Sequence, residues 1–418
     1  MQKDLKKTLP NKGIVVTLMS MIAFGLGSMT ICLPSMGEWG GYFSIDQAVV
    51  QLTFSAFVIA YGFSQVIYGP LSDLYGRRRV ALVGFSIALF GSLLASIAEN
   101  ITMLIVARFV QGAGAASGMV IGRAMIQDYF DGKDRARMMA YIGMVMGLCP
   151  PLAIIIGGQI HVFFDWRSTF LFISFFGAVV TVAICKFLPA RQKEKIPENN
   201  WFTELLSAYK MLLKNPAYLA YVGVVAMSTS AFYVFLTGLP LLLAKNHVGP
   251  AMIGWYVALI PLTYIVGNFL ASRLLKTTSE NNLLMAGLVL SFFGPTIVLI
   301  FSQMGLTSPL FATLPLTLMG LGHGLLMPPA LAGTVGMIPS IAGAAAGGAG
   351  LAQQLAGATG GYVVGTVSHD NPTYLALLLM TSALFAIISY VLLKFFERSK
   401  NNGKDSKNDN RPNESYSL

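Results

Sequence analysis

The stretch Gly69-Pro-Leu-Ser-Asp-Leu-Tyr-Gly-Arg-Arg-Arg79 joins two long apolar runs, at about 47–71 and 79–98. Its glycines, Gly69 and Gly76, permit a tight turn and a close approach of neighbouring helices. Asp73 is an anion suited to the beginning of a helix, and three arginines follow it. We therefore predict a short, charged turn between two helices that cross a membrane.

The composition of the whole chain extends this interpretation. Of 418 residues, 55% are hydrophobic and only 11% are charged, and the mean hydropathy is +0.66. Soluble proteins carry about a quarter charged residues, and a helix needs about 20 apolar residues to cross a bilayer. We predict an all-α integral membrane protein with twelve spans. They are expected at 14–36, 47–71, 79–98, 101–127, 137–160, 167–188, 217–243, 251–273, 282–302, 309–334, 341–367 and 372–394.

The positive charges predict the orientation of the chain in the membrane. With the N-terminus inside, 24 of the 28 Lys and Arg residues fall in cytoplasmic segments. We therefore expect a multi-pass protein of the inner (cytoplasmic) membrane, in contact with the lipid bilayer and with both termini in the cytoplasm. The net charge of +10 follows from this topology and requires no nucleic acid. The three cysteines lie in apolar runs, so we expect neither a disulfide framework nor a metal site.

The polar connection in the middle of the chain divides the spans six and six. Trp201 to Leu213 places apolar residues at helical spacing with charged residues between them, which predicts a helix in the membrane interface. The polar tail is expected to be disordered. The predicted parts are an N-terminus (1–13), a bundle (14–188), a linker (189–216), a second bundle (217–396) and a tail (397–418).

An internal repeat supports two pseudo-symmetric six-helix bundles. Three groups of residues recur in chain order at offsets of 206, 208 and 203. Such halves are typical of secondary transporters, which bind substrate between the halves near the bilayer midplane. The matches are Leu33-Pro34 with Leu239-Pro240, Gln111-Gly-Ala-Gly114 with Met319-Gly-Leu-Gly322, and Gly147 and Gly157-Gly158 with Gly350 and Gly360-Gly361.

The charged turn resembles the signature loop of the major facilitator superfamily, Gly-x-Leu-[Ala/Ser]-Asp-x-x-Gly-Arg-[Arg/Lys]. The resemblance implies the fold of that family and a conformational switch at this turn. It implies that Arg77 pairs with an acid at the end of span four, for which Asp128 is the candidate. The repeat places Asp73 near the beginning of span eleven. A solvated basic loop would explain the arginines but not the spacing of Gly69, Asp73 and Gly76.

The stretch Leu104-Ile-Val-Ala-Arg108-Phe-Val-Gln111-Gly-Ala-Gly114 resembles the span-four motif of the family. The resemblance implies that Arg108 acts in substrate binding or proton coupling. An arginine within a span costs a few kcal/mol and must face a cavity or a partner. The alternative is a structural role, in which Arg108 donates hydrogen bonds to carbonyls of neighbouring helices.

Span five resembles the antiporter motif of the family, which favours export. The chain departs from that motif because Ile154, Ile155 and Ile156 stand where a proline is usual. With Leu33-Pro34, Arg123 to Asp128 and Asp165-Trp-Arg167, the chain is most similar to the bicyclomycin/chloramphenicol-resistance (Bcr/CflA-type) antiporters. The motif residues are Gly143, Gly147, Pro150, Pro151, Gly157 and Gly158.

The midplane of the predicted spans carries cations but no acid. Thr30 stands where the similar antiporters usually have an acid, while Arg108, Arg123 and His323 lie within spans. His323 could change protonation near neutral pH, or it could be a neutral packing residue. This charge pattern favours an anionic, zwitterionic or neutral polar substrate, such as a carboxylate siderophore or an amphenicol. Further candidate polar residues of the site are Tyr61, Gln65, Gln111, Tyr233, Gln353 and Gln354.

These observations predict a secondary active transporter that exports a small organic solute, either a drug or a polar metabolite, by alternating access and proton antiport.

The energy source that we expect is therefore the proton gradient or the membrane potential, with no cofactor and no ATP. The chain lacks the Gly-x-x-x-x-Gly-Lys-[Ser/Thr] loop that an ATP-driven pump needs, and it lacks the paired groups of an enzyme active site. We expect it to function as a monomer on a small-molecule substrate. An uptake symporter for a metabolite or a ferri-siderophore is the alternative.

Overall fold

The computed structural model describes residues 12–130, 132–189, 201–338, 341–367 and 369–409, and these form helices and short connections without a β-strand. The all-α fold is therefore confirmed. Most of the expected N-terminus (1–13) lies outside the described residues, as does the part of the expected linker (189–216) at 190–200. The helices are α1 (Lys12–Thr30), η1 (Leu33–Ser35), α2 (Met36–Phe43), α3 (Gln47–Tyr75), α4 (Arg77–Ser96), α5 (Ile101–Tyr129), α6 (Gly132–Phe163), α7 (Trp166–Phe187), α8 (Trp201–Leu213), α9 (Pro216–Lys245), α10 (Pro250–Leu274), α11 (Glu280–Gln303), α12 (Pro309–Thr313), α13 (Leu316–Gly336), α14 (Ala342–Val364) and α15 (Thr373–Asp409).

Twelve of these helical segments occupy the twelve predicted spans. Eleven of them, within the described residues, are long and apolar enough to cross a membrane. The twelfth, α14, has 23 residues, of which seven are glycine and eight are alanine. Small side chains lower its hydropathy, but they also let it approach other helices closely, as helix interfaces in membranes require.

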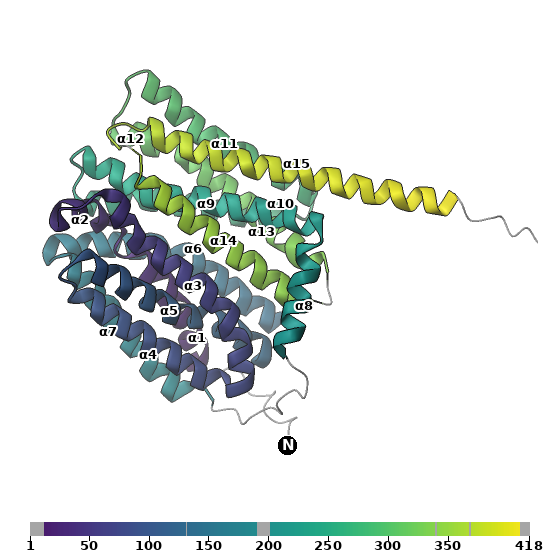
Figure 1. Ribbon diagram of the computed structural model, residues 1–418, viewed down its shortest axis with the longest axis horizontal. Coiled ribbons are helices and arrows are strands. Elements are labelled where there is room, and N and C mark those ends of the chain that lie inside the picture. The colour runs from purple at the N-terminus through teal and green to yellow at the C-terminus, as the bar shows by residue number, and fades with distance from the viewer. Residues whose placement is uncertain (1–11, 131, 190–200, 339–340, 368, 410–418) are drawn as a thin grey trace, which may run out of the picture.

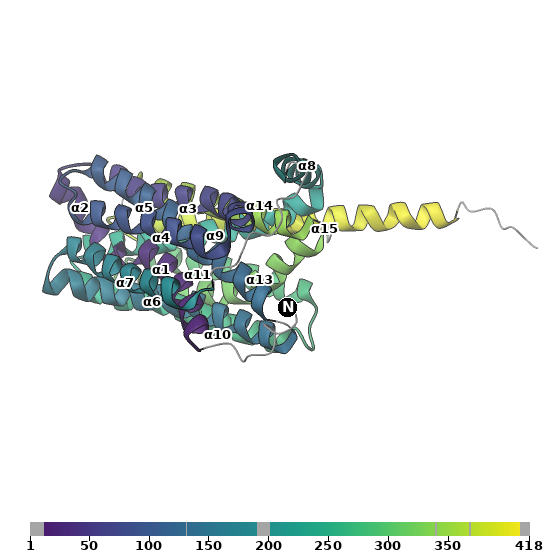
Figure 2. The same cartoon turned by 90° about the horizontal axis from the view of Figure 1, so that it is seen from below.

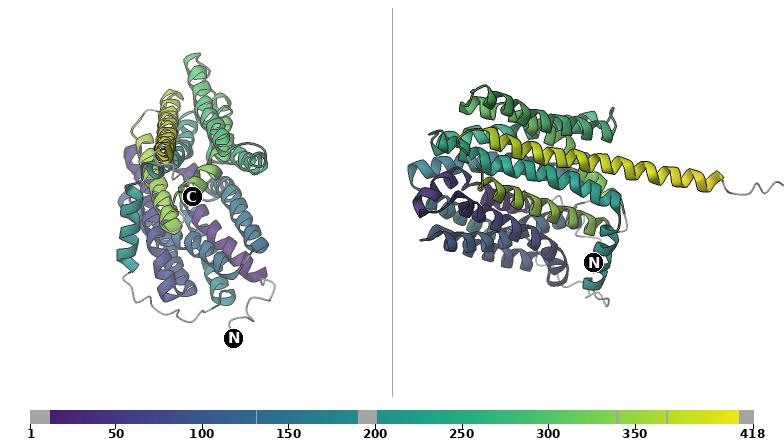
Figure 3. Two further views of the ribbon diagram at one scale, coloured as in Figure 1. Left: turned by 90° about the vertical axis from the view of Figure 1, so that its right-hand side faces the viewer. Right: turned by 45° about the horizontal axis from the view of Figure 1, so that its top comes forward.

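The helices form two bundles that meet along two helix pairs. The N-terminal bundle holds α1 and α3–α7, and the C-terminal bundle holds α9–α11 and α13–α15 (Figures 1 and 3). Across the boundary, α3 packs against α14 and α6 packs against α10. The short helix α8 lies across one end of the molecule (Figure 1) and is seen nearly end-on in Figure 2. The spacing of its apolar residues predicted this helix, and its place in the membrane interface stays a prediction.

The repeated glycines occupy equivalent places in the two bundles. A Cβ on Gly157 of α6 would meet the carbonyl oxygen of Ile31, after α1, and one on Gly360 of α14 would meet Ser230 of α9. The next residue of each pair faces the other bundle. A Cβ on Gly158 would lie 2.5 Å from the Pro250 carbonyl oxygen, and one on Gly361 would lie 3.0 Å from the Phe54 ring. The repeat found in the sequence is therefore a repeat of packing contacts.

Among the described residues, the bundles approach each other closely at one end of the boundary and in its middle. We call the end that carries the α3–α4 turn and α8 the basic end, and the other the opposite end. At the opposite end, a Cβ on Gly37 of α2 would lie 2.8 Å from the Cβ of Ala244 in α9. A Cβ on Gly62 of α3 or on Gly147 of α6 would still meet the other bundle, at 2.7 Å and 2.6 Å. Further towards the basic end, a Cβ on Gly69 of α3 or on Gly143 of α6 would meet no atom within 4 Å. The boundary is thus closed at the opposite end and looser at the basic end.

The last helix continues past the boundary that the sequence predicted. The tail was expected to be disordered from 397, but α15 continues to Asp409. Extending an existing helix avoids the cost of nucleating one, and Lys394 and Glu397 pair three residues apart on it, at 2.6 Å. The rest of the tail lies outside the described residues.

Candidate functional site

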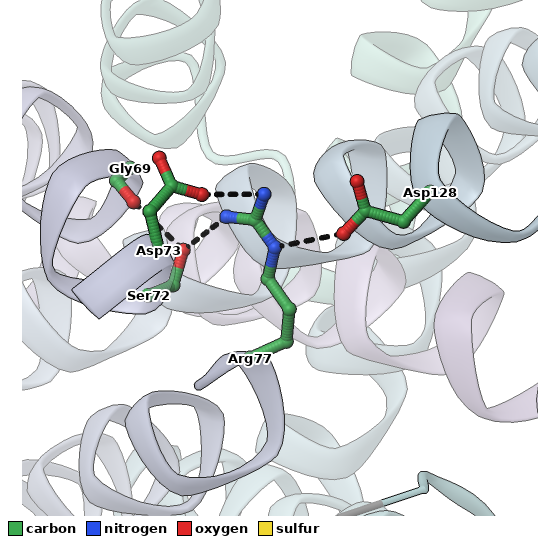
Figure 4. A network of polar contacts seen from close by, with 5 residues as sticks. All are labelled: Gly69, Ser72, Asp73, Arg77 and Asp128. Carbon is green, nitrogen blue, oxygen red and sulfur yellow. Dashed lines mark hydrogen bonds and ion pairs between the residues drawn. The ribbon is translucent and has the colours of Figure 1, made fainter. Parts of the chain in front are cut away.

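The charged turn is held by one arginine that contacts three partners (Figure 4). Gly76 separates α3 from α4 and has a φ of 91°, which favours glycine. Arg77 then donates to Ser72 at 2.5 Å and pairs with Asp73 at 2.6 Å. It also pairs with Asp128, near the end of α5, at 3.1 Å. The predicted pair of Arg77 and Asp128 is therefore confirmed.

This network connects the end of α3, the start of α4 and the end of α5. Ser72 in turn donates to the carbonyl oxygen of Gly69 at 2.8 Å, which extends the network back along α3. The bonds lie at the surface, where water weakens an ion pair. A change of charge at Asp73 or Asp128 would therefore loosen the turn without unfolding a helix. The predicted contact of Asp73 with the beginning of span eleven stays a prediction.

Arg108 lies inside the N-terminal bundle. Its side chain is fully buried, and the guanidinium donates to the backbone carbonyl of Ser28 at 2.7 Å and to that of Met29 at 3.3 Å. It also donates to Gln111, which donates to Ser92 at 2.8 Å. These partners belong to α1, α4 and α5, so the contacts fall within one bundle.

The two carbonyls explain why a cation is buried at this place. The final carbonyls of a helix have no partner within that helix. Because α1 ends at Thr30, Ser28 and Met29 lie in its last turn, and Pro34 favours an end of the helix shortly before it. Arg108 supplies the missing donors, and its positive charge suits the negative end of the helix dipole. The geometry favours the structural alternative for Arg108, and Gln111 belongs to the same network.

Two further predicted site residues lie within the bundles. The Thr30 hydroxyl donates to the carbonyl of Leu26, one turn earlier in α1, at 3.0 Å. His323 of α13 is only 1% exposed, and its ring packs edge-on against Phe232 of α9, with 6.1 Å between ring centroids. His323 therefore lacks contact with water in this conformation.

A polar cluster lies on the boundary between the bundles. Tyr233 of α9 donates to Gln354 of α14 at 2.9 Å, and its hydroxyl lies 3.6 Å from the sulfur of Met29 in α1. The preceding residue of α14, Gln353, donates to Thr229 at 3.0 Å. We call Met29, Thr229, Tyr233, Gln353 and Gln354 the boundary cluster. It brings three of the predicted residues together from separate helices.

The helix α3 adds polar groups to the boundary from the N-terminal bundle. Ser55 donates to the carbonyl oxygen of Ala358 in α14 at 2.8 Å. Further along α3, Gln65 lies close to Gly350 of α14, and Tyr61 is buried on the same face of the helix. The structure therefore places both of these predicted site residues, Tyr61 and Gln65, on the helix that faces α14.

Arg123 differs from Arg108 in its exposure. It lies five residues before Asp128 on α5, on the basic side of Arg108, and its side chain is exposed. The guanidinium is 3.3 Å from the sulfur of Met146 in α6, and it lies near Tyr61 of α3. Arg123 therefore leaves donors available at the looser end of the boundary.

The opposite end of the boundary holds a second group of titratable residues. His161 of α6 bonds to Ser35 at 2.8 Å and to Glu38 at 3.0 Å. Across a cavity of about 400 Å³, His369 lies near Lys245 and is buried. Burial, together with the positive charge of Lys245, lowers the pKa of His369 to about 4.

Reasoning from the sequence did not find several residues of the boundary. Phe54 lies seven residues before Tyr61, on the same face of α3, so helical spacing could have indicated it. Met29 and Thr229 carried no comparable signal, because an isolated Met or Thr in an apolar helix is usually a packing residue. Their roles depend on contacts between distant parts of the chain.

Comparison with known proteins identifies the family. The sequence profile of the Major Facilitator Superfamily matches residues 15–361, and it matches again over 222–415. The chain belongs to the Major Facilitator Superfamily. Proteins of this superfamily similar to this chain are transporters, so the chain is a multi-pass membrane transporter rather than an enzyme. The second match, over the later spans, agrees with the internal repeat.

Relatives in the superfamily include drug-resistance proteins. The chain is 27% identical to multidrug resistance protein D of Escherichia coli, over 80% of this chain and 84% of the relative. It is 25% identical to a bicyclomycin resistance protein homologue of Haemophilus influenzae, over 88% of this chain and 92% of the relative. The predicted resemblance to the Bcr/CflA type is confirmed.

A solved structure of the superfamily shares the fold. It is a bacterial homologue of the human lysosomal transporter Spinster, described as inward-facing and unoccupied. The match has a TM-score of 0.73 and 13% sequence identity, and it covers 95% of this chain and 98% of that protein. At this identity the likeness supports the fold alone.

Proposed function

We propose that this transporter exports a small organic solute by proton antiport and alternating access. The observation that carries the proposal is the boundary itself, which is polar, closed at one end and looser at the other. The boundary cluster supplies hydroxyl, amide and thioether groups from both bundles. The names of the drug-resistance relatives favour export over uptake.

The charge of the site favours a particular class of substrate. Arg123 is exposed at the looser end, and its neighbours Met146 and Tyr61 are not acidic. A cationic drug would therefore gain no compensating charge from this part of the site. We propose a neutral, zwitterionic or anionic substrate, such as an amphenicol or a carboxylate siderophore.

We propose Asp128 as the residue that exchanges the proton. Its side chain is 25% exposed and is paired with Arg77, so water can reach a group that restrains the turn. Protonation would remove the charge that attracts Arg77 and would release α5 from α4 at this point. His323, at 1% exposure, has no such access in this conformation.

The proposed orientation places the basic end in the cytoplasm of a bacterial cell. Arginines of the α3–α4 turn lie at this end, as the positive-inside rule requires. The looser end of the boundary then faces the cytoplasm, from which an exporter takes its substrate. An inside-negative potential would also favour export of an anion, by about 2.3 kcal/mol per charge per 100 mV. We propose that the protein acts as a monomer in the inner membrane.

Transport into proteoliposomes tests the direction of coupling. A thermal-shift panel of cationic drugs, amphenicols and polycarboxylates first selects a ligand of the purified protein. Under an imposed pH gradient, an antiporter accumulates that ligand in the acidic compartment, whereas an uptake symporter accumulates it in the alkaline one. Accumulation in the alkaline compartment, or accumulation that a protonophore leaves unchanged, would contradict the proposal.

One arginine variant tests the assignment of the substrate class. Arg123→Gln should weaken binding of an anionic ligand about tenfold or more, because it removes an exposed guanidinium from the looser end of the boundary. Arg273→Gln is the matched control, since Arg273 is exposed at the basic end of α10. Equal affinity in the Arg123 variant and this control would count against the assignment.

A further inference from the structure

A groove runs along the N-terminal bundle between α3 and α4, near the basic end. Its volume is about 530 Å³, and its lining residues come from α3, α4 and α5. The helices α3 and α4 contact each other much less than each of them contacts α5. They therefore diverge from their shared turn, and Ala113 of α5 lies in the floor of the groove between them.

The walls of this groove are apolar and face away from the other bundle. Ile67 and Val83, which lie on opposite walls, are 54% and 58% exposed. Leu71 and Ile87 extend the same two walls. Because none of the lining residues belongs to the C-terminal bundle, the groove opens to the bilayer. An apolar groove in the lipid-facing surface offers a place for the acyl chain of a single lipid.

The three consecutive arginines of α4 project in three different directions. Successive residues of an α-helix are about 100° apart around its axis. Arg77 binds Asp73 and Asp128, and Arg78 donates to the carbonyl oxygen of Cys185 in α7. Arg79 is exposed and lines the groove, and no hydrogen bond or ion pair joins it to the part of the chain that the structure describes.

We propose that this groove binds one anionic phospholipid. The Arg79 guanidinium binds the lipid phosphate, because its donors match the geometry of phosphate oxygens. An acyl chain lies between Ile67 and Leu71 on one wall and Val83 on the other. The position of the cation, at the end of an apolar groove, is the charge pattern that an anionic lipid complements.

The position of the groove connects the lipid to the switch at the turn. Arg79 lies two residues after Arg77, on the same first turns of α4. A lipid held between α3 and α4 would resist movement of these helices relative to each other. Lipid bound at Arg79 therefore stabilises the conformation in which Arg77 holds Asp128.

Native mass spectrometry of the full-length protein in detergent tests the proposal. Phosphatidylglycerol and phosphatidylcholine with the same acyl chains are added separately, and soluble glycerol phosphate is added as the headgroup without chains. We expect one phosphatidylglycerol to be retained at a concentration at least fivefold lower than phosphatidylcholine. Glycerol phosphate should not compete, because it lacks the chain that fills the groove.

Two variants and a control distinguish the contribution of the positive charge to lipid binding from that of the apolar groove. Arg79→Gln should reduce retention of phosphatidylglycerol to the level of phosphatidylcholine, whereas Arg273→Gln should leave it unchanged. Val83→Trp, which fills the groove and keeps Arg79, should reduce retention of both lipids. Thermal unfolding of each variant verifies that it is folded.

The results that would overturn the proposal are equally specific. They are equal retention of the two lipids, unchanged retention of phosphatidylglycerol in either groove variant, or competition by glycerol phosphate. The measurement does not involve transport, so its result is independent of the proposed direction and substrate.

Discussion

The first helices of the two bundles, α1 and α9, differ more than the internal repeat suggests. α1 ends at Thr30, before Leu33-Pro34, whereas α9 continues through the matching Pro240 to Lys245. Only the interrupted helix leaves carbonyls in mid-bundle for Arg108 to bind. At the offset of 208, the residue of α13 that matches Arg108 is Leu316. This buried arginine is therefore associated with a helix that ends inside its bundle.

The two contacts across the boundary also differ in chemistry. The α6–α10 contact brings Gly158 against the backbone of Pro250. The α3–α14 contact brings Gly361 against the ring of Phe54 and adds a hydrogen bond from Ser55. One contact is therefore made against rigid backbone, and the other includes side chains that can adjust.

The largest expected effect follows from removing the cap of α1. Arg108→Ala should lower the free energy of unfolding by about 3 kcal/mol or more, because it leaves buried carbonyls of Ser28 and Met29 without donors. Thermal unfolding of the purified variant measures this. Arg108→Lys should restore part of the loss, since a lysine donates from a single point. An Arg108→Ala variant that is as stable as the wild type would contradict the cap.

The next largest effect on stability is expected at His369, which differs from His161, the other histidine at the opposite end. His161 bonds to Glu38, whereas burial and Lys245 lower the pKa of His369 to about 4. The unfolded chain binds a proton near pH 6.5 and the folded chain near pH 4. Stability is therefore complete above pH 6.5, falls by up to about 3 kcal/mol as the pH drops to 4, and changes no further from this group.

Unfolding temperatures measured between pH 4 and pH 8 check this dependence. His369→Gln should flatten the decrease, because glutamine does not titrate. If the variant loses stability in acid as steeply as the wild type does, His369 is not the source of the pH dependence.

An intermediate effect distinguishes the two boundary contacts. Gly158→Ala should cost about 1–3 kcal/mol, since the new Cβ meets backbone at 2.5 Å that has little room to move. Gly361→Ala should cost less, because its nearest atom, at 3.0 Å, belongs to the Phe54 side chain. Paired unfolding measurements compare the two variants. A larger loss for Gly361→Ala would reverse the assignment of the rigid contact.

The smallest effect on stability is expected at the charged turn. Asp128→Asn should change the free energy of unfolding by less than about 1 kcal/mol, because both members of the pair with Arg77 are partly exposed. Antiport should nevertheless stop, since the variant no longer exchanges a proton at this position. Normal proton-coupled flux in Asp128→Asn would show that the proton binds elsewhere.

The sequence predicted the parts of the molecule that depend on local pattern. Apolar length located the spans, helical spacing located α8, and the spacing of Gly76 and Arg77 located the turn. Contacts over long separations were less accessible. The bond from Ser55 to Ala358 joins residues 303 positions apart, and no local pattern indicates it.

The role of Arg108 shows why the site was harder to predict than the fold. A charge inside a span must meet a cavity or a partner, and the sequence left the structural role of Arg108 open as an alternative to a role in transport. The choice depended on where α1 ends relative to α5, which is a matter of tertiary packing. The end of α15 was missed for a related reason, since composition alone did not show that a long helix would continue into the polar tail.

The central claim of this account is that the bundles rock about the boundary, here closed at the opposite end. A disulfide between Gly37→Cys and Ala244→Cys tests it directly, in a chain whose exposed Cys185 is replaced by serine. We predict that the cross-link forms without substrate and stops transport, and that reduction of the disulfide restores transport. Transport that continues at the normal rate through fully cross-linked protein would contradict the claim.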